Sequence, residues 1–218
     1  MNSQIENIGY WNWTWETDNQ SPEGTTLSIA FSGYSNAQEA INNSLSKKDK
    51  LSGEKYISVG GGNEAGAFTQ NILESLTLSI QNGDFEGYDG IAYDVEEGES
   101  GLENYFAASF QAAKNKGLKV LVTVSHSAPY GISDARELMY SFFLNENIDI
   151  ISPQLYTTGQ ELENDYDTSQ GVLWNDYENC KAAIVPSIVK ASMYINAQEY
   201  FARLGLTLQG YIQWSQNK

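Results

Sequence analysis

The sequence predicts an α/β protein, a compact (β/α)8 (TIM) barrel, because strand-like and helix-like segments alternate along the chain. Short runs rich in β-branched and aromatic residues predict eight strands, at 5–10, 27–32, 55–60, 88–96, 118–125, 148–156, 182–189 and 208–214. A barrel of this type needs at least ~200 residues. The chain has 218, so we expect a single domain over residues 1–218.

Helices are expected between most strands, at 37–48, 65–81, 101–116, 133–145, 171–180 and 196–204. The link 11–26 is polar and shows no apolar helical face, and the sequence ends shortly after Trp214. We therefore expect the first and last outer helices to be missing or rudimentary.

The composition favours a folded protein that does not bind polyanions. Hydrophobic residues make up 41% of the chain and aromatic residues 12%, which supplies a sizeable core. Twelve basic against 28 acidic residues give a net charge of −16, which repels nucleic acids and anionic membrane surfaces. We expect a neutral partner, although solubility alone also explains the charge.

Cys180 is the only cysteine and His126 the only histidine. Thiolate clusters, His-rich metal centres and an intrachain disulfide are therefore excluded, and we expect no metal or cofactor. The sequence has no apolar run of ~20 residues, and residues 1–6 lack a basic signal region. We expect a monomer that is extracellular if a signal was removed and cytoplasmic otherwise.

The stretch YDGIAYDVEE at 88–97 carries two acids on one face of a strand. In an extended strand Ala92, Asp94 and Glu96 point one way and their neighbours the other, so the acids face the barrel lumen. The carboxyl ends of barrel strands hold active sites. Two adjacent carboxylates favour sharing a proton, which makes a general acid available. The alternative is a strand end with solvated acids.

The same stretch fits the motif D-G-x-D-x-D-x-E at Asp89, Gly90, Asp94 and Glu96, with Ala92 in place of the first inner aspartate. Further matches, in order along the chain, are NIGYW at 7–11, SIAF at 28–31, SVGG at 58–61, QLY at 154–156 and QWS at 213–215. Together they resemble glycoside hydrolase family 18, the chitinases and their relatives. The small plant and fungal type of that family is most similar.

The resemblance implies retaining, substrate-assisted hydrolysis of β-1,4-linked N-acetylglucosamine oligo- or polysaccharides. Glu96 would be the general acid, and Asp94 would orient the substrate's 2-acetamido group, whose oxygen attacks the anomeric carbon. Tyr156 would donate a hydrogen bond to that group. The resemblance also implies pocket-lining roles for Tyr10, Phe31, Gln154 and Trp214.

Three departures or special features accompany the resemblance. Ala92 removes a carboxyl next to Asp94, so we expect weakened activity with a shifted pH profile. The alternative is a catalytically silent barrel that binds carbohydrate like a lectin or serves as a storage protein. Thr157 stands where relatives often carry Asp or Asn, which changes one sugar contact. The family's cis peptides would correspond to Ala30–Phe31 and Trp214–Ser215.

Other motifs have both a functional and a structural interpretation. Trp11, Trp13 and Trp15 alternate, so their indoles either stack against sugar rings or pack beneath the shortened link. The glycine-rich run 59–63 lacks the lysine of a phosphate loop and indicates close backbone approach. Ser125-His126-Ser127 suggests a Ser-His pair or, more simply, a histidine at the barrel rim. The acids at 161–167 are expected to be solvated.

Overall fold

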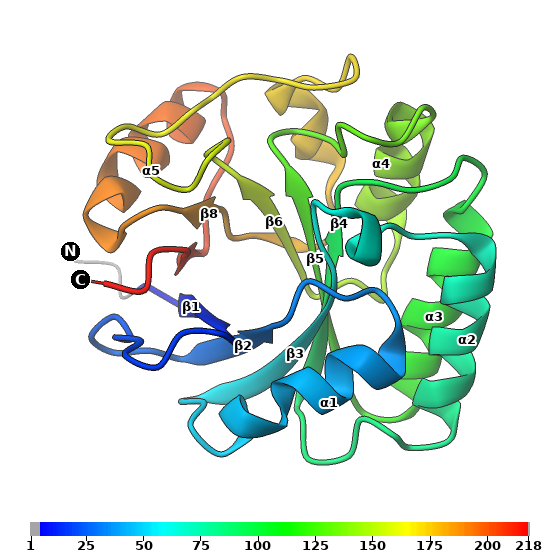
Figure 1. Cartoon of the computed structure of the whole chain (residues 1–218). Helices are drawn as coiled ribbons and strands as arrows, with labels where there is room; N and C mark the ends of the chain where they lie inside the picture. Colours follow the sequence, from blue (N-terminus) through cyan, green and yellow to red (C-terminus); the bar gives the residue numbers. More distant parts are fainter. Residues whose placement is uncertain (1–4, 218) are drawn as a thin grey trace.

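The computed structural model describes residues 5–217, so the first four residues of the polar N-terminal stretch lie outside it. The strands are β1 (Asn7–Trp13), β2 (Leu27–Phe31), β3 (Glu54–Gly60), β4 (Gly90–Val95), β5 (Lys119–Ser125), β6 (Ile150–Gln154), β7 (Ala183–Ile184), β8 (Ser187–Ile188) and β9 (Gly210–Gln213). They pair in parallel in the order β5-β4-β3-β2-β1-β9-β8-β6, and β6 pairs with β5 to close the ring (Figure 1). The predicted parallel barrel is confirmed.

The seventh position of the ring is filled by two short strands in place of the one predicted over 182–189. β7 pairs with β6 at Ile150 and Ile151, and β8 joins β6 to β9. Pro186 lies between β7 and β8 and has no N–H to give to a neighbouring strand. The Val185 N–H still donates to the Ile151 carbonyl at 3.0 Å, so the barrel stays closed across the break.

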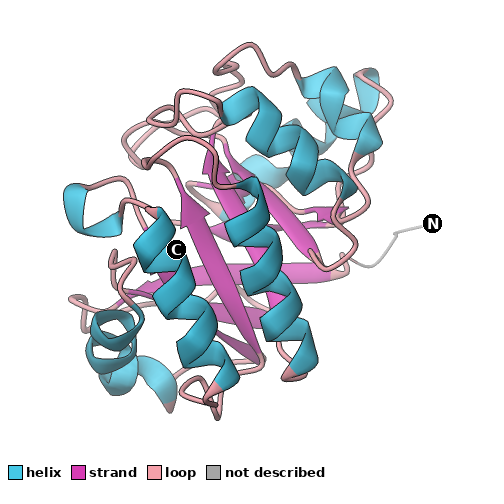
Figure 2. Ribbon diagram, turned by 90° about the vertical axis from the view of Figure 1, so that its right-hand side faces the viewer, coloured by secondary structure: helices cyan, strands magenta, loops and turns pink. Residues whose placement is uncertain are grey.

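The α-helices lie outside the ring, as Figure 2 shows: α1 (Ala37–Lys48), α2 (Gln70–Gln81), α3 (Glu103–Asn115), α4 (Ala135–Leu144) and α5 (Tyr194–Arg203). Short 3-10 helices are η1 (Glu64–Gly66), η2 (Trp174–Asn179) and η3 (Ala191–Met193). α2 begins five residues later than predicted because Thr69 caps it, accepting from the Ile72 N–H at 3.1 Å. The α-helix predicted at 171–180 is only η2, where Asp176 accepts from the Leu173 N–H and tightens the turn.

No helix connects β1 to β2, and within the described residues none follows β9 (Figure 1), as predicted. A buried glutamine holds this seam together. The Gln216 side chain donates to the Trp11 carbonyl at 2.7 Å and accepts from the Trp13 N–H at 3.1 Å and from Asn19 at 2.6 Å. Hydrogen bonds therefore take the place of helix packing at the link between β1 and β2.

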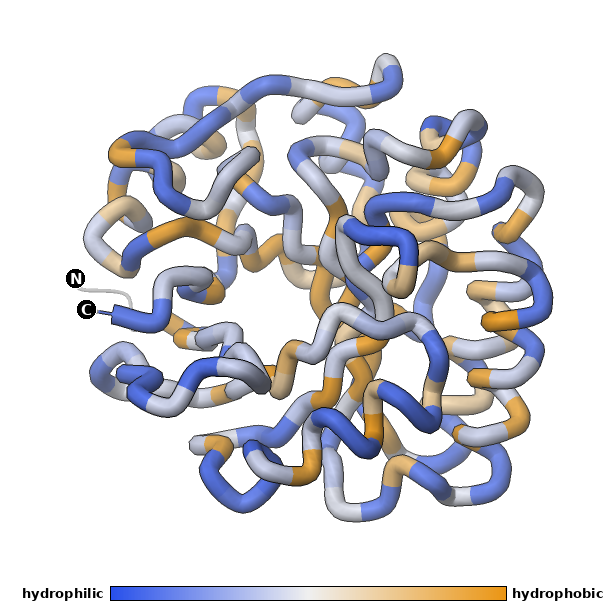
Figure 3. The backbone as a smooth tube through the Cα atoms, viewed as in Figure 1, coloured by the Kyte–Doolittle hydropathy of each residue, from blue (hydrophilic) through white to orange (hydrophobic). Residues whose placement is uncertain are grey.

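The core has two parts, separated by the wall of the barrel. Outward-facing strand residues such as Ile91, Tyr93 and Val95 pack with the helices. Inward-facing residues such as Ala92 and Ile29 fill the lumen. Figure 3 accordingly shows hydrophobic colour along the central strands and hydrophilic colour on outer loops. No helix within residues 5–217 has the length and apolar character needed to cross a membrane.

We expect Phe106→Ala to lower the free energy of unfolding by about 3–5 kcal/mol, because it leaves a cavity in the outer core. The Phe106 ring is fully buried against the rings of Phe68, Phe110 and Phe142. Urea denaturation measures the change. Leu78→Ala, at an exposed position on α2, is the control and should cost under ~0.5 kcal/mol. Equal losses in the two variants would contradict this account of the core.

Candidate active site

A cavity of about 270 Å³ opens where β2, β4, β6 and β9 end. Every site residue predicted from the sequence except Tyr10 lines it. The lining residues are Phe31, Gly62, Asn63, Asp94, Glu96, Gln154, Tyr156, Thr157, Thr158 and Trp214. This is the end of a parallel barrel at which loops of all strands converge and at which active sites form.

Tyr10 is buried but is not among the residues that line the cavity. β1 runs on to Trp13, and Trp11 packs in the lumen with Ile29 and Ile212. Because side chains alternate along a strand, Tyr10 lies on the opposite face of β1. The sequence pattern had placed the end of this strand too early, which made Tyr10 its last residue.

Asp94 and Glu96 project from one face of β4, Glu96 from one residue beyond its end. Asp94 is only 3% exposed, which rules out a solvated strand end. The Gln154 amide donates both to Asp94 Oδ1 at 3.1 Å and to Thr123 Oγ1 at 3.2 Å. Both N–H groups of this amide are therefore used, and they fix the Asp94 carboxyl in the lumen.

Burial raises the pKa of both carboxyls, and the charge of Glu96 raises the pKa of Asp94 further. A hydrogen bond between the two carboxyls also raises the pKa of Asp94 and lowers that of Glu96. Glu97 raises the pKa of Glu96, and His126 lowers it. The pair therefore shares a proton well above the pH at which free carboxyls ionise. One neutral carboxyl is available as a proton donor.

Glycines bring the third strand's loop against the acids, which is the close approach that the run 59–63 predicted. A Cβ atom at Gly62 would overlap Oε2 of Glu96, and one at Gly60 would overlap the Asp94 carbonyl. Gly60 also has a φ of 97°, which favours glycine. Gly62 therefore lets the backbone of this wall approach the Glu96 carboxyl closely.

Aromatic rings form the other wall. Trp214 stacks on Tyr156 with ring centres 5.7 Å apart, and Phe31 meets Trp214 edge-on at 5.3 Å. The Tyr156 hydroxyl is buried without a hydrogen-bond partner among the described residues. Burial and the negative charges of Asp94 and Glu96 raise its pKa, so it stays a neutral donor. A buried donor beside a cavity indicates a place for a ligand acceptor.

The two cis peptides that the family resemblance implied are absent. Within residues 5–217 the structure contains no cis peptide bond, so the expectation for Ala30–Phe31 and Trp214–Ser215 is wrong. Phe31 and Trp214 reach the cavity on trans backbone through packing. Both rings pack edge-on against Trp11, with ring centres 5.7 and 6.1 Å away.

Small side chains lie in the lumen beneath Asp94, a feature the sequence analysis missed. Ala92 pairs in register with Ser58, whose hydroxyl is buried without a partner among the described residues. The remaining hydroxyls are hydrogen-bonded: Thr123 to the Ser152 carbonyl at 2.7 Å and Ser152 to Ser187 at 2.9 Å. Strand alternation alone could have found this layer. The unpartnered Ser58 marks the place where Ala92 leaves a polar contact unmade.

His126 lies at the rim, and the Ser-His interpretation of its tripeptide fails. Its Nε2 pairs with Asp165 at 3.0 Å, and Thr157 donates to the same carboxylate at 3.1 Å. The Ser125 and Ser127 hydroxyls donate instead to backbone carbonyls. Among the rim acids, Glu161 and Asp165 are not simply solvated, because both accept hydrogen bonds that shape the loop.

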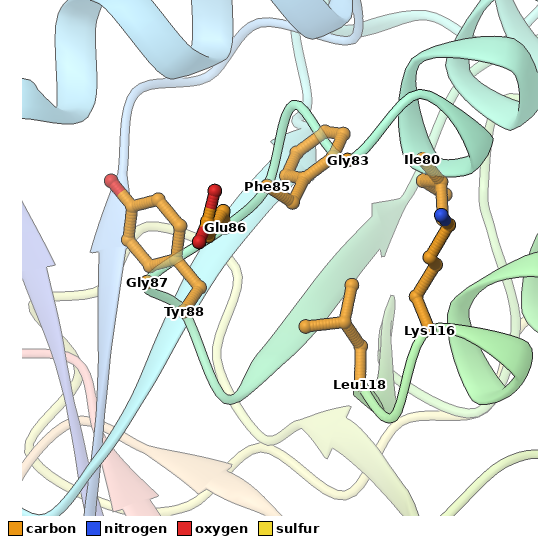
Figure 4. A pocket seen from close by; sticks show the side chains of 8 residues that line it. All are labelled: Ile80, Gly83, Phe85, Glu86, Gly87, Tyr88, Lys116 and Leu118. Atoms are coloured by element: carbon orange, nitrogen blue, oxygen red, sulfur yellow. The ribbon is translucent and has the colours of Figure 1, made fainter.

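A second cavity of about 270 Å³ lies at the opposite end of the barrel, beside the C-terminal ends of α2 and α3 (Figure 4). Its side chains are mostly apolar, with Glu86 and Lys116 as the only charged ones. Within residues 5–217 no group of three or more metal-ligating side chains comes together. The paired carboxylates therefore make the first cavity the candidate active site.

Comparison with known proteins supports the fold. No protein-family model matches the sequence, and no curated protein does. Among solved structures, the spore cortex-lytic enzyme SleL of Bacillus megaterium QM B1551 superposes with a TM-score of 0.59. The match covers 99% of this chain and 71% of SleL at 8% sequence identity. The chain therefore shares the barrel architecture of a lytic enzyme.

We expect the shared proton to make stability depend on pH. Because the folded pKa values of Asp94 and Glu96 are raised, the folded state holds a proton that the unfolded chain releases. Their contribution is full below about pH 4 and is lost as pH rises through the raised values. Asp94→Asn removes one of the two carboxyls, so the free energy of unfolding of this variant should fall less between pH 4 and 8 than that of the wild type.

Urea denaturation across that range tests the expectation. Glu163→Gln, which removes an exposed rim carboxyl, is the matched control and should follow the wild-type profile. Parallel curves for wild type and Asp94→Asn would show that the two carboxyls do not share a proton.

Proposed function

We propose that the protein is a retaining glycoside hydrolase of family 18 type that cleaves β-1,4-linked N-acetylglucosamine glycans with help from the substrate's acetamido group. The observation that carries the proposal is the buried Asp94–Glu96 pair, with its raised pKa values, in a cavity walled by aromatic rings. The barrel shared with SleL, an enzyme named for lysis of the spore cortex, supports a glycan as the substrate class.

The proposed reaction uses the two carboxyls in turn. Glu96 gives its proton to the glycosidic oxygen while the acetamido carbonyl oxygen attacks the anomeric carbon, and the glycosidic bond breaks. Asp94 holds the acetamido N–H and stabilises the positive charge of the cyclic intermediate. Glu96, now a carboxylate, takes a proton from water as that water opens the ring, so configuration is retained. Atoms and charges balance without a covalent bond between the sugar and the enzyme.

The remaining cavity residues fit the same substrate. The unpartnered Tyr156 hydroxyl is a donor suited to the acetamido oxygen. Trp214 offers an apolar surface for a pyranose ring, and Gln154 holds Asp94 in position. The rim is acidic and the net charge is −16, which favours a neutral glycan as the substrate. The same charge disfavours self-association, so we propose that the enzyme is a monomer.

A second function, glycan binding without catalysis, is favoured by Ala92. The residue is buried in the lumen with Tyr56 and Leu121, and because it is alanine, Asp94 has no carboxyl beneath it with which to exchange a proton. Without that exchange, Asp94 shares its proton with Glu96 alone. Such a site would bind an N-acetylglucosamine oligomer and release it unchanged.

We expect wild-type protein to cleave N-acetylglucosamine oligomers and Glu96→Gln to lower kcat by about 10²–10⁴-fold, since it removes the general acid. Chromatography of the products and NMR of the first-formed anomer measure both rate and configuration. Glu163→Gln, at an exposed rim carboxylate, is the control and should retain cleavage. Binding without cleavage by wild type would support the silent alternative, and an inverted product would overturn the mechanism.

We expect Ala92→Asp to raise kcat several-fold and to shift the pH profile. The new carboxyl would lie on the lumen face one residue pair below Asp94 and would give the Ser58 hydroxyl an acceptor. Ala92→Asn, of the same size but without charge, separates charge from packing. Kinetics at pH 4 to 8 with thermal melting of each variant provide the test. Equal activity in the two variants would contradict a role for the charge.

A further inference from the structure

An exposed tryptophan lies at the rim of the cavity on the loop that replaces the first outer helix. Trp15 follows the end of β1, and 57% of its surface is exposed. Its ring stacks on Trp13 at a centroid distance of 5.6 Å and a 24° angle, and it meets the edge of Phe31 at 5.9 Å. The exposed indole is therefore held in place by two aromatic neighbours.

The backbone adds to this fixed position. The Thr14 N–H donates to the Phe31 carbonyl at 3.0 Å, and the Glu16 N–H donates to the Trp13 carbonyl at 3.2 Å. These bonds tie the residues before and after Trp15 to strands of the barrel. Holding a large side chain in this way gives a ligand a surface that loses little conformational freedom on binding.

The aromatic surface continues into the candidate active site. Trp13 packs against Trp214 with ring centres 4.9 Å apart, and both Phe31 and Trp214 line the cavity. We call Trp13 and Trp15 the tryptophan ledge. A ligand that rests on Trp214 can therefore extend onto the ledge without leaving aromatic surface.

Packing beneath the shortened link does not account for the ledge. Trp11 meets that expectation, since it is buried in the lumen. The seam is closed by the hydrogen bonds of Gln216, and Trp15 keeps more than half of its surface in solvent. A fixed, exposed aromatic beside a cavity is typical of a binding surface.

We propose that the tryptophan ledge is an additional binding site for a neutral pyranose ring of the glycan whose adjoining part occupies the cavity. Indole faces suit the apolar faces of sugar rings. Glu16 and Asp18 follow Trp15 closely in sequence, and their negative charges disfavour an acidic sugar. The nearby Lys47 ammonium already donates to the Glu16 carbonyl. This inference rests on the proposed function and extends it to ligands of several rings.

Isothermal titration with N-acetylglucosamine dimer and pentamer tests the ledge in a Glu96→Gln background, in which the ligands stay intact. We expect Trp15→Ala to weaken pentamer binding about five- to tenfold and to leave dimer binding within about twofold of the parent. Trp15→Phe should show a smaller loss. Leu162→Ala, which removes another exposed apolar side chain of the rim, is the control and should change neither affinity.

Each other outcome has a distinct meaning. If Trp15→Ala leaves pentamer affinity unchanged, the ledge is not a binding site. Equal losses for dimer and pentamer together with a lowered melting temperature also overturn the proposal, because they indicate that Trp15 only packs. With Glu96 intact, Trp15→Ala must likewise lower kcat/KM for the pentamer more than for the dimer. If neither oligomer binds the Glu96→Gln protein or the wild type, the proposed function is overturned, and the proposal for the ledge with it.

Discussion

The site depends on the burial of the Asp94 carboxyl within the mouth of the barrel. A carboxyl removed from water disfavours its charged form, so it must be neutralised or surrounded by donors. Both conditions apply here, because burial and the charge of Glu96 raise the pKa of Asp94, which favours its neutral form, and Gln154 donates to it at 3.1 Å. Each partner comes from a strand end, and closure of the ring between β5 and β6 brings these ends together. Stability and chemistry are therefore linked through one proton.

The layer beneath Asp94 determines how that proton is held. Apart from Ser58, its hydroxyls use their hydrogen bonds on one another or on backbone carbonyls, so they cannot take the proton. Ser58 is left without a partner opposite Ala92. With alanine at position 92, no carboxyl lies below Asp94, and the proton is shared between Asp94 and Glu96. The hydrogen bond between the carboxyls raises the pKa of Asp94 and lowers that of Glu96, so it favours the proton on Asp94, which has no carboxyl below it with which to exchange that proton.

Periodicity predicted most of this architecture because it reports which side of a strand faces the core. Ala92, Asp94 and Glu96 were placed correctly on the lumen face, since alternation over β4 is unbroken. Tyr10, whose pocket-lining role came from the family resemblance and not from periodicity, does not line the cavity. The predicted end of β1 was three residues early because pairing with β2 continues to Trp13 and Phe31, which no local pattern encodes. The break at Pro186 depends on how β7 and β8 pair with the distant strands β6 and β9. The 3-10 form of η2 has a local cause, the hydrogen bond from the Leu173 N–H to Asp176, which helical periodicity does not report.

The absence of a helix between β1 and β2 has a further consequence for the site. Without a helix after β1, the chain turns back at Trp15 and must be anchored some other way. Gln216 provides that anchor by joining the C-terminal segment to the carbonyl of Trp11 and the N–H of Trp13. The same hydrogen bonds fix the base of the tryptophan ledge. The shortening of the barrel thus removes helix packing at the seam and leaves, in its place, a rigid aromatic surface open to solvent beside the acids.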